Sequence, residues 1–97
     1  MAEFARAPAT ATVQVETDRV RVTRYDFADG AETGWHRHAH DYVVVPLQDG
    51  VLQIEAADGM RRVPLAAGAS YARGAGVEHN VINASGGPFA FVEIELL

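Results

Sequence analysis

Apolar and polar side chains alternate in short runs along most of this chain. Residues 13–16 alternate strictly, and in residues 20–27 polar side chains such as Arg21 and Thr23 are interleaved with β-branched and aromatic ones. Both patterns are typical of half-buried β-strands. Residues 42–47 form a nearly continuous apolar run, which predicts a strand buried on both faces. No stretch combines a helical period with helix caps, so the chain is expected to be all-β.

Glycine-containing turns divide the chain at short intervals. Asp49-Gly50 and Asp58-Gly59 suit the positive φ values of hairpin turns, and Pro64 suits an edge strand. Several short strands without helices are typical of a sandwich or barrel. No linker or repeat is present, so we expect one domain over residues 1–97, with residues 1–11 as a loose N-terminal arm. The eight or nine predicted strands cover residues 13–16, 20–27, 35–38, 42–47, 51–57, 60–65, a short stretch from 67 to 73, 77–83 and 89–96.

The composition and charge of the chain limit the kinds of partner that we expect it to bind. The formal net charge is −5, and the only adjacent basic pair is Arg61 and Arg62, so no nucleic-acid partner is expected. No apolar run approaches the roughly 20 residues of a membrane span, and the first residues lack the pattern of a signal peptide. We therefore expect a cytoplasmic protein without a membrane partner. Because the chain has no cysteine, disulfides, thiolate metal ligands and a thiol nucleophile are excluded.

Three of the four histidines lie in one short stretch of the sequence. His36 and His38 are two residues apart, so on a strand they leave the same face with attachment points roughly 6.6 Å apart. Two imidazoles at that separation can bind one ion, because each nitrogen lies roughly 2.1 Å from a bound metal. His79 lies in a later predicted strand, and we expect the fold to bring it to the pair.

Ligation by nitrogen alone favours one divalent transition metal, Fe, Zn, Ni or Cu, over Mg or Ca. Three protein ligands leave positions open on the ion, which is the arrangement of catalytic sites. The alternatives are that these histidines are ordinary surface or hydrogen-bonded residues, or that an ancestral site is now empty.

Two glycine-containing patterns make the spacing more specific. The first is Gly30, His36, His38, Val43 and Gly50, with intervals of five, one, four and six residues. The second is Gly68, Gly74, Gly76, His79 and Asn83, with intervals of five, one, two and three residues. Together they resemble the two conserved motifs of the cupin superfamily, here over residues 30–50 and 68–83.

The resemblance implies a single-domain jelly-roll β-barrel whose central metal is bound by His36, His38 and His79. Val43 stands where the family usually has a glutamate ligand, and Gly74 where it usually has a proline. Members with three histidines and no acidic ligand include iron-dependent dioxygenases acting on thiols and β-diketones. Cupins are commonly dimers, so the resemblance also implies a homodimer.

The residues next to the histidine pair are candidates for proton transfer. His40 shares strand parity with the pair, but the gap before Val43 suggests a bulge that re-aims it. We place His40 at the rim of the site as an acid/base candidate, with ligation as the alternative, and Tyr42 as a second proton carrier. Asp41 is positioned to accept a hydrogen bond from a ligand imidazole.

Other residues are candidates for binding a substrate. Trp35, Tyr42 and Tyr71 suit the wall of a pocket, with core packing as the alternative. Arg73 suits a bidentate contact with a substrate carboxylate, with a solvated edge charge as the alternative. Asn83 is expected to fix a turn through its side chain.

These features support three hypotheses about function. The first is a metal-dependent enzyme acting on a small organic molecule, in its sharpest form an Fe(II) dioxygenase. The second is a non-catalytic module that binds or senses a small ligand, which the short chain favours because little of it is left for a lid. The third is a metal-dependent isomerase or lyase in which His40 or Tyr42 carries the proton.

Overall fold

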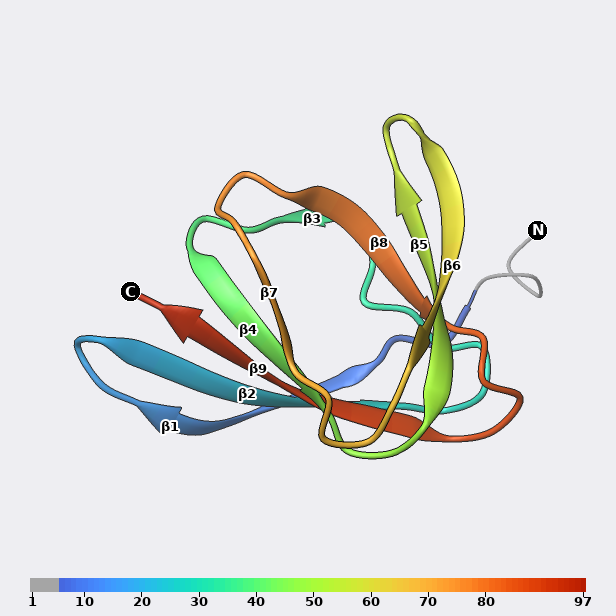
Figure 1. Ribbon diagram of the computed structural model, residues 1–97, viewed down its shortest axis with the longest axis horizontal. Helices are drawn as coiled ribbons and strands as arrows, with labels where there is room; N and C mark the ends of the chain where they lie inside the picture. The colour runs from blue at the N-terminus through green and yellow to red at the C-terminus, as the bar shows by residue number, and fades with distance from the viewer. Residues whose placement is uncertain (1–5) are drawn as a thin grey trace.

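The computed structural model describes residues 6–97, which form nine strands and no helix (Figure 1). The all-β expectation is confirmed, and within residues 6–97 there is no helix that could span a membrane. The strands are β1 (Thr10–Glu16), β2 (Val20–Phe27), β3 (His36–Arg37), β4 (Asp41–Pro46), β5 (Gly50–Ala56), β6 (Gly59–Leu65), β7 (Tyr71–Arg73), β8 (Glu78–Asn83) and β9 (Phe89–Leu96).

Two antiparallel sheets enclose the core as a jelly-roll barrel. One sheet has the strand order β1-β2-β9-β4-β7 and the other the order β3-β8-β5-β6. Their inner faces meet in an aromatic cluster in which the rings of Phe27 and Phe91 lie 5.4 Å apart and those of Phe89 and Phe91 lie 6.4 Å apart. Leu52 and Val81 pack against this cluster from the second sheet. Burial of these side chains is the main force that holds the two sheets together.

The strand predicted over residues 42–47 is buried on one face only. Tyr42, Val44 and Pro46 are buried, whereas Val43 and Val45 are half-buried. The expectation of burial on both faces was therefore wrong. The physical reason is that β4 belongs to an antiparallel sheet with only its inner face against the core.

Two local predictions are confirmed. Pro64 lies in β6, which is an outer strand of its sheet. The Asn83 amide donates to the carbonyls of Ala28 at 3.1 Å and Gly87 at 2.7 Å, and its side-chain oxygen accepts from the Ser85 amide at 3.0 Å. Asn83 is 1% exposed, so this side chain fixes the turn from within.

Only part of the predicted N-terminal arm, residues 1–11, can be compared with the structure. Residues 1–5 lie outside the described residues. Farther along, the Ala9 amide donates to the Glu32 carbonyl at 2.7 Å, and the Glu32 amide donates to Ala7 at 2.9 Å. Thr10 already belongs to β1, which pairs with β2 of the same chain. Residues 7–11 are thus attached to the barrel rather than loose.

Candidate metal centre

The histidine cluster is built by β3 and β8. His36 and His79 are direct partners in the antiparallel register of these strands, so both side chains leave the same face. His38 follows β3, and its amide donates to the Val77 carbonyl at 2.8 Å, while its carbonyl accepts from Gly76 at 2.8 Å. These bonds extend the pairing beyond the short strand and keep His38 in phase with His36.

The three rings converge through their Nε2 atoms. The Nε2 atom of His38 lies 2.9 Å from Nε2 of His36 and 3.2 Å from Nε2 of His79. One ligand atom from each histidine can be chosen so that all lie within 4.8 Å of one another. The expected meeting of His79 with the pair is confirmed. Three imidazole nitrogens at these separations can hold one ion.

Contacts on the other side of the rings fix their orientation. Nδ1 of His36 lies 2.8 Å from the Gly34 carbonyl, which only accepts hydrogen bonds, so the proton resides on Nδ1 and donates to it. Nε2 of a neutral His36 is then left with its lone pair facing the cluster. Nδ1 of His38 faces Oε1 of Glu93 at 4.0 Å. Such contacts orient metal-binding imidazoles in proteins.

The surroundings of His38 and His79 favour neutral imidazoles at these two positions. His38 is 7% exposed and His79 is 9% exposed. Burial, helped by the charge of His36, lowers the pKa of each to about 4. Both rings are therefore uncharged at neutral pH, as a metal-binding imidazole must be. A divalent cation fits this donor set, because it would accept lone pairs that otherwise face one another.

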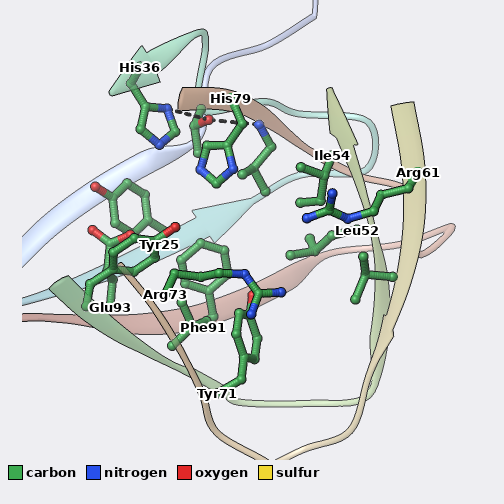
Figure 2. Close-up of a pocket in the computed structure, with 15 residues that line it drawn as sticks. Tyr25, His36, Leu52, Ile54, Arg61, Tyr71, Arg73, His79, Phe91 and Glu93 are labelled. Carbon is green, nitrogen blue, oxygen red and sulfur yellow. Dashed lines mark hydrogen bonds between the residues drawn. The ribbon is translucent and has the colours of Figure 1, made fainter. Parts of the chain in front are cut away.

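His36 and His79 of the cluster form one end of a pocket between the two sheets (Figure 2). Apolar side chains of the core make its floor, and Tyr25 and Tyr71 lie on one side of it. Burial is the largest cause that raises the pKa of both tyrosines, that of Tyr25 to about 12, so their hydroxyls keep their protons. The full lining consists of Tyr25, Thr33, His36, Tyr42, Val44, Leu52, Ile54, Arg61, Val63, Tyr71, Arg73, His79, Val81, Phe91 and Glu93.

Glu93 is a pocket residue that the sequence reasoning missed. It lies on β9 opposite Val44 of β4, so its side chain shares the inner face. It is 6% exposed, and burial, together with the charge of Glu95, raises its pKa to about 7. The signal was present in the sequence, because Glu93 is in phase with Phe89 and Phe91 in the alternation of the last strand.

Tyr42, rather than Val43, is the residue of β4 that faces the histidines. The rings of Tyr42 and His38 are stacked with centroids 3.8 Å apart and an angle of 16° between their planes. Val43 pairs with Ile94 and Ala72 on the opposite face of the sheet. Reading Val43 as the residue at the metal was therefore wrong, since successive strand residues point to opposite faces.

The structure does not bring three of the other candidates into the pocket. The chain bends at residues 39–40, as expected, and His40 is not part of the cluster, but it lines a second hollow together with His36 and His38, at the rim of the site. Trp35 is 53% exposed, and because it adjoins the inward-facing His36 it points outward, which corrects its assignment to the pocket wall or the core. Asp41 accepts a hydrogen bond from the Ala75 amide at 2.8 Å, so its expected contact with a ligand imidazole was wrong.

Comparison with known proteins agrees with this geometry. The family described as Cupin_2, a cupin domain, matches residues 23–95. The chain belongs to the cupin family. This cupin is 59% identical over 91 residues to the Beta-alanine degradation protein BauB of Pseudomonas aeruginosa, with 94% of this chain and 96% of the relative covered.

Solved structures show the same fold. A cupin domain from Bordetella pertussis has a TM-score of 0.94 and 51% identity to this cupin, with 97% of this chain and 98% of that one covered. The polyketide cyclase RemF from Streptomyces resistomycificus has a TM-score of 0.74 at 18% identity, covering 95% of this chain and 70% of that one. At that identity the likeness shows the fold alone.

Proposed function

We propose that this cupin is a metal-dependent enzyme that acts on a small organic molecule, with His36, His38 and His79 binding one divalent transition metal. The observation that carries the proposal is the convergence of three imidazoles, two of which, His36 and His79, line the end of a pocket. In its sharpest form the activity is that of an Fe(II) dioxygenase. When bound, the metal supplies Lewis-acid chemistry and, if it is iron, redox chemistry with O₂. The role in β-alanine degradation named for its relative supports a small-molecule substrate.

The residues of this chain hold and shield the reacting centre. The Gly34 carbonyl keeps the proton of His36 on Nδ1, and Tyr42 stacks against His38, so both rings present Nε2 to the same point. The apolar floor excludes water from one side of that point, which strengthens electrostatic interactions there. Of the residues proposed to bind substrate from the sequence, Tyr71 and Arg73 line this pocket.

Metal analysis of the untagged protein tests the histidine site. The wild-type protein is expected to carry close to one equivalent of metal, and His79→Ala to lose it, because only two ligands remain. His40→Ala is the matched control, since His40 lies outside the cluster, and it should keep its metal. If all three proteins hold the same amount of metal, the assignment of the ligands is wrong.

Oxygen consumption tests the reaction. The iron-loaded protein is given a panel of thiols, β-diketones and hydroxy acids, and one class is expected to cause O₂ uptake that His79→Ala abolishes. If no compound causes uptake, the dioxygenase form of the proposal fails.

The second candidate function is a non-catalytic module that binds or senses a small ligand. It is supported by the apolar side chains that line much of the pocket, Val44, Leu52 and Ile54 among them, which suit the binding of a small ligand without turnover. The isomerase or lyase hypothesis keeps both of its proton carriers near the histidines, because His40 shares a hollow with His36 and His38 and Tyr42 lines the pocket. The Tyr42 hydroxyl holds its proton because burial raises its pKa. A ligand recovered unchanged, which raises the melting temperature equally with and without metal, would favour the binding module.

We also propose that the protein is a cytoplasmic homodimer. The support for a dimer is β1, an outer strand whose seven residues are all exposed, with Val13 54% and Val15 46% accessible. An apolar, unpaired strand edge is suited to pairing with a second chain. Light scattering after size exclusion is expected to give twice the chain mass for the wild type and the single mass for Val13→Glu. Equal single masses for both would refute the dimer.

A further inference from the structure

Two arginines enter the pocket from inward positions of different sheets. Arg61 on β6 pairs with the buried Ile54, whereas the next residue, Arg62, pairs with Gln53 on the outer face. Arg73 on β7 pairs with the buried Tyr42. The strand register therefore directs Arg61 and Arg73 toward the inner face, and both, although exposed to solvent, line the same pocket as His36 and His79.

The two arginines come from outer strands of the two sheets. β6 and β7 are outer strands of their respective sheets, and they follow one another in the chain. Figure 2 shows Arg61 and Arg73 reaching into the pocket from these two strands, with His79 on the far side. Both arginines line the pocket that His36 and His79 also line.

Neither arginine has an anionic partner among residues 6–97. Arg21 and Arg24, by contrast, form ion pairs with neighbouring carboxylates, at 2.6 Å in the case of Arg21 and Glu16. The guanidinium carbon of Arg73 lies 4.9 Å from the centre of the Tyr71 ring, and one of its nitrogens donates to the Ala72 carbonyl at 3.2 Å. The stacking places the Arg73 side chain across the pocket while most of its donors stay free.

We propose that Arg61 and Arg73 together bind the carboxylate of a small aliphatic acid whose other end reaches the histidine cluster. Two guanidinium groups offer paired donors that match the geometry of a carboxylate. Leu52, Ile54 and Phe91 line the same pocket as the arginines and His79, so the connecting part of the ligand is apolar. The metal-bound end of the ligand rests on the proposed function, but the carboxylate end requires only the two arginines.

Malonate binding to the full chain tests the subsite. Its affinity for the metal-free and the zinc-loaded protein is measured by calorimetry, beside the neutral malonamide. We expect Arg61→Gln and Arg73→Gln each to weaken malonate binding about tenfold in both forms, which is a typical loss for one charge-assisted contact. Arg62→Gln, on the outer face of the same strand, should bind within about twofold of wild type. Malonamide should bind at least tenfold more weakly than malonate.

The outcomes separate this inference from the proposed function. If malonate binds the metal-free protein and depends on both arginines while no metal or turnover is found, the subsite stands and the enzyme proposal fails. If the protein binds metal and turns over a substrate but both inner variants bind malonate as Arg62→Gln does, the subsite is wrong. Arg61→Lys and Arg73→Lys keep the charge and should restore part of the affinity, which separates lost contacts from lost folding. Equal binding of malonate and malonamide would also overturn the inference.

Discussion

Glu93 is expected to make the metal-free protein less stable as the pH rises. The folded protein holds the proton of Glu93 up to pH values near its raised pKa of about 7, whereas the unfolded chain releases it near the ordinary pKa of a glutamate. The folded state thus binds more protons than the unfolded chain between these two pH values. The contribution of Glu93 to the free energy of unfolding is therefore fully present at low pH and is lost as the pH rises through 7. A raised pKa of this size corresponds to a loss of about 2 kcal/mol between pH 5 and pH 8.

The replacement Glu93→Gln removes this loss, because glutamine is neutral at every pH. Urea unfolding of the metal-free proteins at pH 5 and pH 8 gives the free energy of unfolding for each. We expect the difference, variant minus wild type, to rise by about 2 kcal/mol from pH 5 to pH 8. The buried His38 and His79 destabilise the folded state as the pH falls below 6.5, because their pKa values are about 4, but they do so in both proteins.

The matched control is Glu78→Gln on β8, which replaces an exposed glutamate. Its stability should follow that of the wild type at both pH values, within about 0.5 kcal/mol. The reasoning that burial sets the pKa of Glu93 would be refuted by either of two results. One is a stability of Glu93→Gln relative to the wild type that does not grow with pH, and the other is a variant less stable than the wild type at pH 8.

Three further predictions concern metal and packing. Zinc should raise the melting temperature of the wild type but not of His79→Ala, because a ligand stabilises only a state that binds it, and differential scanning calorimetry measures this. Gly50→Ala should lower the free energy of unfolding by about 1–3 kcal/mol in urea titrations, since a Cβ atom there would clash with the Phe89 ring and lie 2.6 Å from Ser85 Oγ; unchanged stability would contradict the packing of this turn. Asn83→Ala should cost about 2–4 kcal/mol in the same assay, because it leaves several buried backbone groups without partners, and a smaller loss would mean that water replaces the amide.

The histidine cluster could be predicted from the sequence because part of its geometry is local. The spacing of His36 and His38 fixes their common face, and the family resemblance supplied His79. The phase of β4 could not be derived in the same way. It depends on where the bend after His38 ends. The interval of four residues after His38 indicated Val43, but the residue that faces the cluster is Tyr42.

Glu93 and Arg61 were missed for a different reason. Each lies in a strand whose alternation marks the inner face, with Phe89 and Phe91 in β9 and with Val63 in β6. A charged residue in phase with buried apolar ones is a recognisable signal, but its meaning depends on which strands meet across the barrel. That pairing is set by contacts between residues far apart in the chain, as between β4 and β9.

The chemistry inferred for a site without an acidic ligand still follows, although Val43 is not the residue responsible. Glu93 comes from the sheet opposite the histidines and faces Nδ1 of His38, whereas the nitrogens that converge are Nε2. In this position the carboxylate orients an imidazole instead of joining the three nitrogens. A divalent ion there would keep most of its positive charge, and Arg61 and Arg73 add positive charge at the other end of the pocket. Both ends of the pocket therefore favour an anionic ligand. Replacing either arginine with glutamine should weaken the binding of an acid more than the binding of its neutral amide.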